Sequence, residues 1–167
     1  ILSLLSPRLD QAGLSLSHVL FVTVESTHAC KTGGDNVRAD LQKRNLRQIQ
    51  KRQIIATHSN LSPEEVRQYP VVVFLDDIIG SGITLWNEIQ TFCQRFQLPY
   101  NGHPQIFFAC IAPRRHGVRH LVENCDKYGI PIYGLYRPEW FVEPAFPKGS
   151  DTYLQLEPYE RLIGAYM

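Results

Sequence analysis

The sequence predicts an α/β fold, an open parallel sheet of about five strands with helices on both faces. Apolar runs rich in β-branched and aromatic residues alternate along the chain with amphipathic stretches of helical spacing. The central apolar run, residues 71–75, shows no polar alternation, which is typical of a strand covered on both faces. Strands that alternate with helices form right-handed βαβ units, and these units build a parallel sheet.

The first strand and the first helix are expected before residue 55. Residues 18–25, HVLFVTVE, form a β-branched and aromatic run suited to a buried strand. Turn-forming residues follow this run. A helix is expected over residues 36–54, where apolar residues recur at helical spacing and Asp35 or Asn36 can serve as the N-cap.

The middle of the chain predicts a second strand, a second helix and the central strand. A short strand is expected over residues 53–57. Pro63, followed by two glutamates, marks the start of a helix within residues 59–70. The central strand then spans residues 71–77, VVVFLDD, and ends on two acidic residues.

Two further helix and strand pairs complete the expected sheet. Apolar residues recur every three or four positions over residues 83–98, which predicts a helix. Residues 105–112, QIFFACIA, predict a buried strand, and a helix over residues 118–129 stops at Gly129. The last strand is expected over residues 130–136.

The whole chain, residues 1–167, is interpreted as a single domain. Its core is expected over about 18–136, and the segment 137–167, rich in proline and aromatic residues, is expected to cap a sheet edge. No internal repeat or linker divides the chain. Because the first ten residues lack the features of a signal peptide, we expect a piece excised from a longer protein, with other domains of that protein as partners.

The composition excludes several function classes. The formal net charge of +1 gives no global field for nucleic acid, and no apolar run is long enough to span a membrane. Residues 31–52 carry seven lysines and arginines against two aspartates, either as an anion-facing element or as the solvated face of a helix. Four cysteines without a CxxC pair favour a reduced, cytoplasmic setting, with Cys110 as a small core residue.

The candidate functional residues lie where the central strand ends, in the sequence DDIIGSGIT. Ligands of open parallel sheets bind beyond the carboxyl ends of the strands, where Asp76 and Asp77 are expected. The next turn, residues 80–84, leads into a helix, so that free backbone N–H groups and the positive helix end meet there. Glycines at 80 and 82 allow close approach of an anion, and hydroxyls at 81 and 84 add donors. The turn therefore favours phosphate, while the two carboxylates favour a hydroxyl-rich group, and a sugar phosphate satisfies both.

Residues 72–84 resemble the PRPP-binding motif of type I phosphoribosyltransferases. That motif has four apolar, two acidic and two apolar residues before a small-residue phosphate loop that ends in Thr or Ser. One departure is Gly80, where the family usually has Thr, Ser, Ala or Val. The chain looks like a divergent phosphoribosyltransferase-like domain, of a kind found in larger multidomain proteins, some associated with bacterial conflict systems.

This resemblance implies a role for each matching residue. Asp76 and Asp77 would bind the ribose 2′ and 3′ hydroxyls. The 5′-phosphate would lie against Gly80, Ser81, Gly82, Ile83 and Thr84. Pyrophosphate would lie against Lys31, Thr32, Gly33 and Gly34, with Lys31 neutralising its charge as it departs. Mg²⁺ would arrive with PRPP, held mostly by the substrate and otherwise by the two aspartates. The reaction would transfer the phosphoribosyl group to a nitrogenous base.

Two functions remain open at this stage. Enzymes of the family have a long basic loop between the second and third core strands, whereas residues 58–70 hold one arginine and two glutamates. Either the strand over 53–57 is wrong and residues 43–52 form that loop, or the closing loop is missing. In the second case the domain would be a nucleotide-sensing regulatory module that binds without turnover. An oligomer is compatible with both.

The remaining candidates each have a structural alternative. Arg114 reaches phosphate or base, or is a solvated residue at a helix end. Trp140 stacks on a base, or packs within the cap. His116 and His120 with Cys125 have a spacing that can bind zinc, but no second ligand pair supports it. A nucleoside triphosphatase would need an upstream GxxxxGK[ST], which the sequence lacks.

Overall fold

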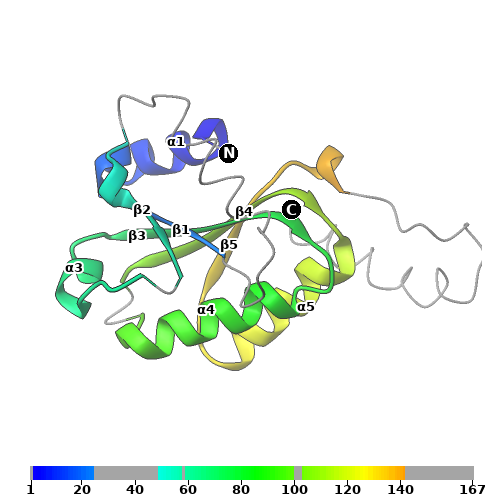
Figure 1. Ribbon diagram of the computed structural model, residues 1–167. Helices are drawn as coiled ribbons and strands as arrows, with labels where there is room; N and C mark the ends of the chain where they lie inside the picture. Colours follow the sequence, from blue (N-terminus) through cyan, green and yellow to red (C-terminus); the bar gives the residue numbers. More distant parts are fainter. Residues whose placement is uncertain (1, 25–48, 58, 100–102, 142–167) are drawn as a thin grey trace, which may run out of the picture.

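A parallel sheet forms the centre of the molecule (Figure 1). The computed structural model describes residues 2–24, 49–57, 59–99 and 103–141. The sheet has five strands in the order β2-β1-β3-β4-β5, and every neighbouring pair is parallel. In chain order these strands are β1 Val19–Thr23, β2 Ile54–Ala56, β3 Val71–Ile79, β4 Gln105–Pro113 and β5 Ile132–Leu135. The predicted α/β class and the parallel sheet of five strands are confirmed.

Helices cover both faces of this sheet (Figure 1). One face carries α1, and the other carries α3, α4 and α5. These helices span α1 Leu2–Gln11, α3 Pro63–Arg67, α4 Ile83–Phe96 and α5 Arg115–Lys127, and three short 3₁₀ turns are η1 Leu16–His18, η2 Lys51–Gln53 and η3 Pro138–Trp140. None of the helices in these ranges is both long enough and apolar enough to cross a bilayer.

The two sheet faces give two apolar clusters, because successive strand residues point to opposite sides. Val72 and Phe74 pack under α4 and α5, whereas Val71 and Val73 pack under α1. Phe74 meets Phe92 of α4 edge to face at 5.3 Å between ring centroids.

The described cysteines, Cys93, Cys110 and Cys125, are unpaired and buried, as expected of small core residues. Burial raises the pKa of each of these thiols to about 12.

Several boundaries differ from the sequence prediction. Helix α1 was not predicted, although Leu5 and Leu9 are four residues apart and fully or almost fully buried. Pro7 inside it removes a backbone donor, which masks the helical signal.

The helix expected over 36–54 lies mostly outside the described residues, and its predicted end is wrong, because residues 51–53 form η2 and β2 begins at Ile54. Of the expected cap, residues 142–167 lie outside the description.

A buried glutamine holds the start of the sheet together. Gln53 is 2% exposed, and its side-chain amide donates to the carbonyl oxygens of Leu16 and Val19 at 2.7 and 2.8 Å. Its Oε1 accepts the backbone N–H of Gln50 at 2.8 Å. This side chain therefore ties the segment before β2 to η1 and to the first residue of β1, and a leucine of similar volume would make none of these hydrogen bonds.

Replacement of this residue gives a direct test of the packing. We expect Gln53→Leu to lower the free energy of unfolding by about 2–4 kcal/mol, because buried backbone groups lose their partners. Urea denaturation with the slope compared between variants measures the change. The matched control is Gln94→Leu on the exposed side of α4, which should change stability by less than about 0.5 kcal/mol. Equal effects of the two substitutions would contradict this role.

Candidate functional site

The candidate site begins where β3 and β4 extend beyond β1. The pairing of β1 with β3 ends at Thr23 and Leu75, whereas β3 and β4 stay paired as far as Ile79 and Pro113. Asp76 and Asp77 therefore lie within the last part of β3, not at its last residue as the sequence predicted. They lie next to the end of β1, which is the switch point of a sheet with this strand order, where ligands of such folds bind.

The first carboxylate is partly buried and perturbed. Asp76 accepts the backbone N–H of Asp77 on its Oδ1 at 2.9 Å. Burial, followed by the charge of Asp77, raises the pKa of Asp76 from 3.8 to about 7. The backbone carbonyl of Asp77 accepts the thiol of Cys110 on β4 at 3.3 Å, which secures this part of the strand. A ligand that supplies hydroxyl donors or a cation would relieve the repulsion between these carboxylates.

The turn after β3 places the N-terminus of α4 beside them. Gly82 is the N-cap of α4 and has a φ of +77°, a conformation that favours glycine. Ser81 accepts the backbone N–H of Ile83 at 3.4 Å, a long hydrogen bond. Neither Asp nor Glu occurs in the first turn of α4. Backbone donors and the positive end of the helix dipole therefore face the end of the sheet.

The turn packs backbone against backbone on the first turn of α5. A Cβ built on Gly82 would lie 2.1 Å from the carbonyl oxygen of Gly117. A Cβ on Gly117 would lie 2.2 Å from the carbonyl oxygen of Gly80. A Cβ on Gly80 itself would meet nothing within 4 Å. The two turn glycines therefore have different surroundings, and their close approach to an anion stays a prediction. Gly82 is required by its backbone and by α5, and Gly80 has room for a side chain.

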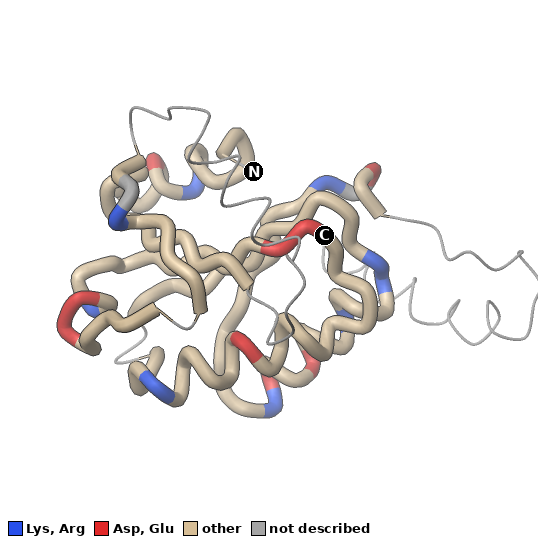
Figure 2. Tube along the Cα trace, viewed as in Figure 1, with Lys and Arg blue, Asp and Glu red and all other residues tan. Residues whose placement is uncertain are grey.

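Helix α5 brings a second N-terminus to the same place. The backbone N–H of Arg114, its N-cap, donates to the carbonyl of Ile79 at 2.8 Å, which links the start of α5 to the end of β3. Arg114 is exposed, and no acidic residue occupies the first turn of α5. Figure 2 shows basic positions at the β4–α5 connection and acidic positions on the tube near the end of β3. Cations at a helix N-terminus are unfavourable unless an anion joins them.

Aromatic side chains pack around the ends of β4 and β5. Arg115 stacks on Phe141 with 4.6 Å between the guanidinium carbon and the ring centroid. Phe141 in turn meets Tyr136 edge to face at 5.2 Å. Trp140, predicted to stack on a base, is partly buried, and the guanidinium of Arg137 lies 5.8 Å from its ring centroid. Both the stacking and the packing interpretations of Trp140 therefore stay open.

Four predicted residues lie outside the description. These are the residues expected to hold pyrophosphate, Lys31, Thr32, Gly33 and Gly34.

The connection that precedes β3 is described except for residue 58. Because β2 is a real strand, residues 43–52 do not connect it to β3, and residues 57–70 contain the short helix α3. Ser62 and Glu65 close this helix start with reciprocal hydrogen bonds, a capping box, and the helix start predicted from Pro63 is confirmed.

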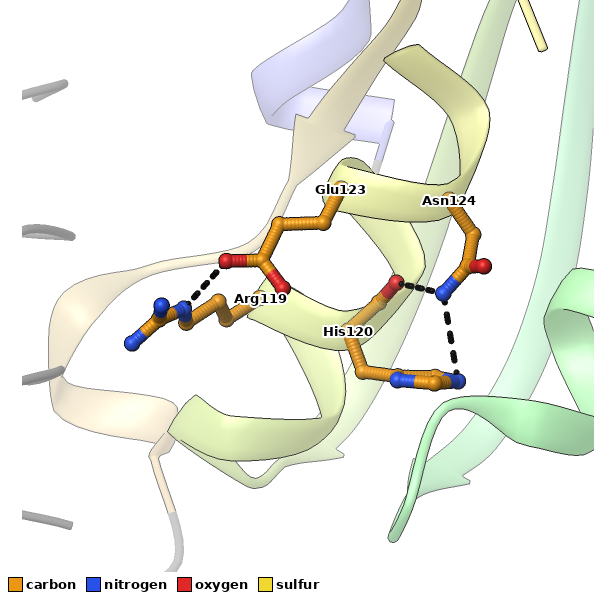
Figure 3. Close-up of polar contacts among 4 residues, drawn as sticks. All are labelled: Arg119, His120, Glu123 and Asn124. Atoms are coloured by element: carbon orange, nitrogen blue, oxygen red, sulfur yellow. Dashed lines mark hydrogen bonds and ion pairs between the residues drawn. The ribbon is translucent and has the colours of Figure 1, made fainter. Parts of the chain in front are cut away.

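The histidines of α5 do not form a metal site with Cys125. His120 and Asn124 contact each other, and the Asn124 amide donates to the His120 carbonyl at 2.7 Å (Figure 3). Arg119 pairs with Glu123 on the neighbouring side of the helix (Figure 3). Cys125 is completely buried. Within the described residues no three His, Cys, Asp or Glu side chains come together to hold a metal ion.

Two of the cavities lined by described residues open at the other edge of the sheet, where the strands begin. One, of about 300 Å³, lies beside Arg8, Gln105 and Tyr133. Another, of about 240 Å³, lies beside Gln53 and Tyr69. Gln105 is the first residue of β4, and Gln53 directly precedes β2. Neither cavity belongs to the edge that carries the acidic pair.

Sequence reasoning missed Gly117 as part of the site. It lies between His116 and the helix expected over residues 118–129. Since α5 begins at Arg115, Gly117 lies inside the helix, where a glycine often has a packing reason. Its contact partner cannot be read from the sequence, because 35 positions separate Gly117 from Gly82.

The raised pKa of Asp76 predicts a pH-dependent cost in stability. The folded pKa, about 7, exceeds the ordinary value of 3.8, so stability is complete below about pH 4 and is lost as the pH rises through 7. We expect Asp76→Asn to gain a few kcal/mol over the parent protein at pH 8, at about 1.4 kcal/mol for each pH unit that separates the folded from the unfolded pKa, and almost nothing at pH 4. Chemical denaturation at both pH values measures this gain. The exposed Asp10→Asn should show no such gain, and a pH-independent effect of Asp76→Asn would exclude this cause.

The glycine contact predicts opposite outcomes at two neighbouring positions. Gly117→Ala should lower the free energy of unfolding by about 1–3 kcal/mol, because its Cβ overlaps the Gly80 carbonyl and the turn must shift. Gly80→Ala should be tolerated, because its Cβ meets open space. Thermal unfolding of the two variants makes the comparison. If Gly117→Ala is as stable as Gly80→Ala, the backbone contact does not hold the turn.

The family comparison agrees with this geometry. The family model PRTase-CE matches residues 12–138. No curated protein and no solved structure shows significant similarity to the chain. The matched range begins directly after α1 and contains all five strands, the acidic pair and the turn before α4. Because this range is more than half of the chain, the protein belongs to the PRTase-CE family and is a phosphoribosyltransferase-like domain.

Proposed function

We propose that this domain binds PRPP, or a related ribose 5-phosphate or nucleotide ligand, at the carboxyl end of β3. One observation carries the proposal, namely that two adjacent carboxylates lie beside the N-terminus of α4 at the switch point of the sheet. An acidic pair favours cations or hydrogen-bond donors, whereas an anion-binding turn favours a negatively charged group. A ligand with vicinal hydroxyls next to a phosphate matches both.

The acidic pair fits the sugar. Ionised Asp76 and Asp77 accept hydrogen bonds only, and the 2′ and 3′ hydroxyls of ribose are neighbouring donors. Hydrogen bonds to charged acceptors are the stronger kind and favour the ionised form. The energy lost by burying Asp76 in the free protein is then partly recovered on binding, because hydroxyls replace the water that the carboxylate has lost.

The turn fits the 5′-phosphate. Backbone N–H groups at the start of α4 can donate to phosphate oxygens, and Ser81 and Thr84 are exposed and can add hydroxyl donors. Arg114, exposed at the adjacent N-terminus of α5, supplies a positive charge. The phosphate would then lie between the starts of two helices, on the β3–β4 side of the ribose.

The acidic pair also suits a magnesium ion that arrives with the ligand. Mg²⁺ prefers carboxylate and phosphate oxygens and keeps several waters, so Asp76 and Asp77 together with ligand oxygens form a suitable donor set. When bound, the ion supplies positive charge to the phosphate groups. The raised pKa of Asp76, which burial and the charge of Asp77 cause, agrees with a place that a cation or hydroxyl donors would stabilise.

The proposed reaction is displacement at the anomeric carbon. A bond forms between a ring nitrogen of the base and C1 of the ribose, and the bond between C1 and the pyrophosphate oxygen breaks, its electron pair leaving with pyrophosphate. The protein contributes by positioning and by stabilising charge. Lys31, which lies outside the described residues, is proposed to neutralise the departing group.

The second candidate is a sensor that binds the same ligand without turnover. The connection between β2 and β3 favours it, because this connection is short, contains the capped helix α3 and has one arginine. A closing loop excludes water and completes many active sites. The described part of this connection has no long segment that can close over a leaving group.

One experiment separates the two candidates. The protein is incubated with PRPP, Mg²⁺ and a panel of purine and pyrimidine bases, and pyrophosphate release is measured alongside calorimetric binding of PRPP. Transfer predicts release that Asp77→Asn abolishes and that the exposed Asp126→Asn leaves unchanged. A sensor predicts saturable binding without release, weakened at least about tenfold by Asp77→Asn. No binding of PRPP, ribose 5-phosphate or nucleoside monophosphates would reject the proposal.

The backbone contact between Gly82 and Gly117 decides which substitutions can test the turn. A valine at Gly82 collides with the Gly117 carbonyl, so loss of binding in that variant would report on folding as well as on phosphate. Ser81→Ala and Thr84→Val remove hydroxyls from exposed positions and leave the backbone contact intact. These two variants are therefore the suitable probes of the phosphate site.

A further inference from the structure

A cavity of about 300 Å³ lies between the end of α1 and the beginning of β4 and β5. On the helix side it is lined by Arg8 and Gln11, which are three residues apart and therefore share one face of α1. On the sheet side it is lined by Phe107 and Tyr133, which are paired in register on β4 and β5. Gln105, two positions before Phe107, lies on the same face of the sheet. Three separate segments of the chain thus form this cavity.

The sheet is incompletely covered beside this cavity. Parallel sheets are normally buried on both faces. On this face the described helix is α1, and its Leu5 and Leu9 are buried against the strands (Figure 1). Tyr133 lies beyond that contact and is 47% exposed, although it belongs to a strand. Its ring lies 5.4 Å from the ring of the buried Phe107, centroid to centroid. The cavity therefore offers an accessible aromatic surface.

Arg8 adds a positive charge to the same cavity. Its guanidinium carbon lies 5.7 Å from the centroid of the Phe107 ring, and its side chain is exposed. Within the described residues no carboxylate forms an ion pair with it. An aromatic ring offers the guanidinium no oxygen acceptor, so its N–H donors are left for water or a ligand. None of the residues that line the cavity is acidic.

These side chains together favour one kind of ligand. A guanidinium matches the two oxygens of a carboxylate with parallel hydrogen bonds. An exposed aromatic ring favours another planar ring against it. The amides of Gln11 and Gln105 can donate to or accept from polar substituents. A volume of about 300 Å³ is at the small end for ligand cavities, and it suits a single ring with its substituents.

We propose that this cavity binds a small aromatic carboxylate, with the ring against Tyr133 and the carboxylate on Arg8. The site goes beyond the proposed function, because it lies at the edge where the strands begin and shares no residue with the acidic pair or its turn. The domain then has two ligand sites, one at each edge of the sheet. Binding at the second site does not require that PRPP binds at the first.

Two simple probes test the proposal on the full chain. Benzoate has the ring and the carboxylate, and benzamide has the same shape without the charge. We expect the parent protein to bind benzoate with a Kd of about 1 mM, which is reasonable for so small a ligand, and to bind benzamide about tenfold more weakly. Arg8→Gln should remove this preference. Tyr133→Thr should weaken the binding of both probes about fivefold. Ligand-observed NMR titration measures each Kd.

Arg95→Gln is the matched control. The Arg95 guanidinium also lies over a ring, 4.9 Å from the Phe96 centroid, but on α4 and outside this cavity. This variant loses the same charge and the same kind of contact, so it should keep the preference for benzoate.

Several results would overturn the inference. These are no binding of benzoate to the parent protein, a preference that survives Arg8→Gln, or an equal loss in Arg95→Gln. If Arg8→Gln does not fold, Tyr133→Thr carries the test, and unchanged benzoate binding in that variant also overturns the inference. A parent protein that binds benzoate but no PRPP would reject the proposed function and leave this site in place.

Discussion

The candidate site depends on one contact, the backbone of the turn before α4 against the first turn of α5. Gly82 and Gly117 allow it, because a Cβ on either would overlap a carbonyl group of the other segment. The contact draws the N-termini of two helices to the end of β3, and the hydrogen bond from Arg114 to Ile79 fixes the second helix there. The positive ends of two helix dipoles then face the same short stretch of chain as the two carboxylates.

Two carboxylates at such short range have an energetic consequence. Asp76 is partly buried beside another carboxylate, so in the free protein its charge is disfavoured. The buried hydroxyls of Thr57 and Ser59, directly after β2, likewise lack hydrogen-bond partners within the described residues. Unsatisfied groups therefore gather at the carboxyl edge of the sheet, whereas Gln53 near the opposite edge is fully hydrogen-bonded. Stability is lower where a ligand is expected to bind, which is the usual relation between a binding site and the fold that supports it.

Local sequence patterns were sufficient to predict most of the fold and part of the candidate site. The five strands and the helices α4 and α5 could be predicted because each buries an apolar run or stripe that is visible in its own sequence, and α3 carries its own capping signal. Asp76 and Asp77 could be singled out because a turn rich in glycine and hydroxyl residues follows them directly in the sequence. The end of β3 was misplaced by two residues, since strand length there depends on pairing with β4. Helix α1 was missed because Pro7 interrupts its signal, and its stability comes from Leu5 and Leu9 packing on the sheet.

By itself the sequence determined the fold class, the order of the elements and the chemical character of the acidic pair and its turn, because these depend on residue type and on neighbours within a few positions. Only the tertiary structure decided why Gly82 is a glycine, which helix it touches and which hydroxyls are left unsatisfied at the end of β2. Those properties depend on contacts between segments far apart in the chain, and the distance between two backbones in space leaves no local trace in either one. The same reason explains how Gly80 and Gly82, two positions apart and identical in type, have different roles.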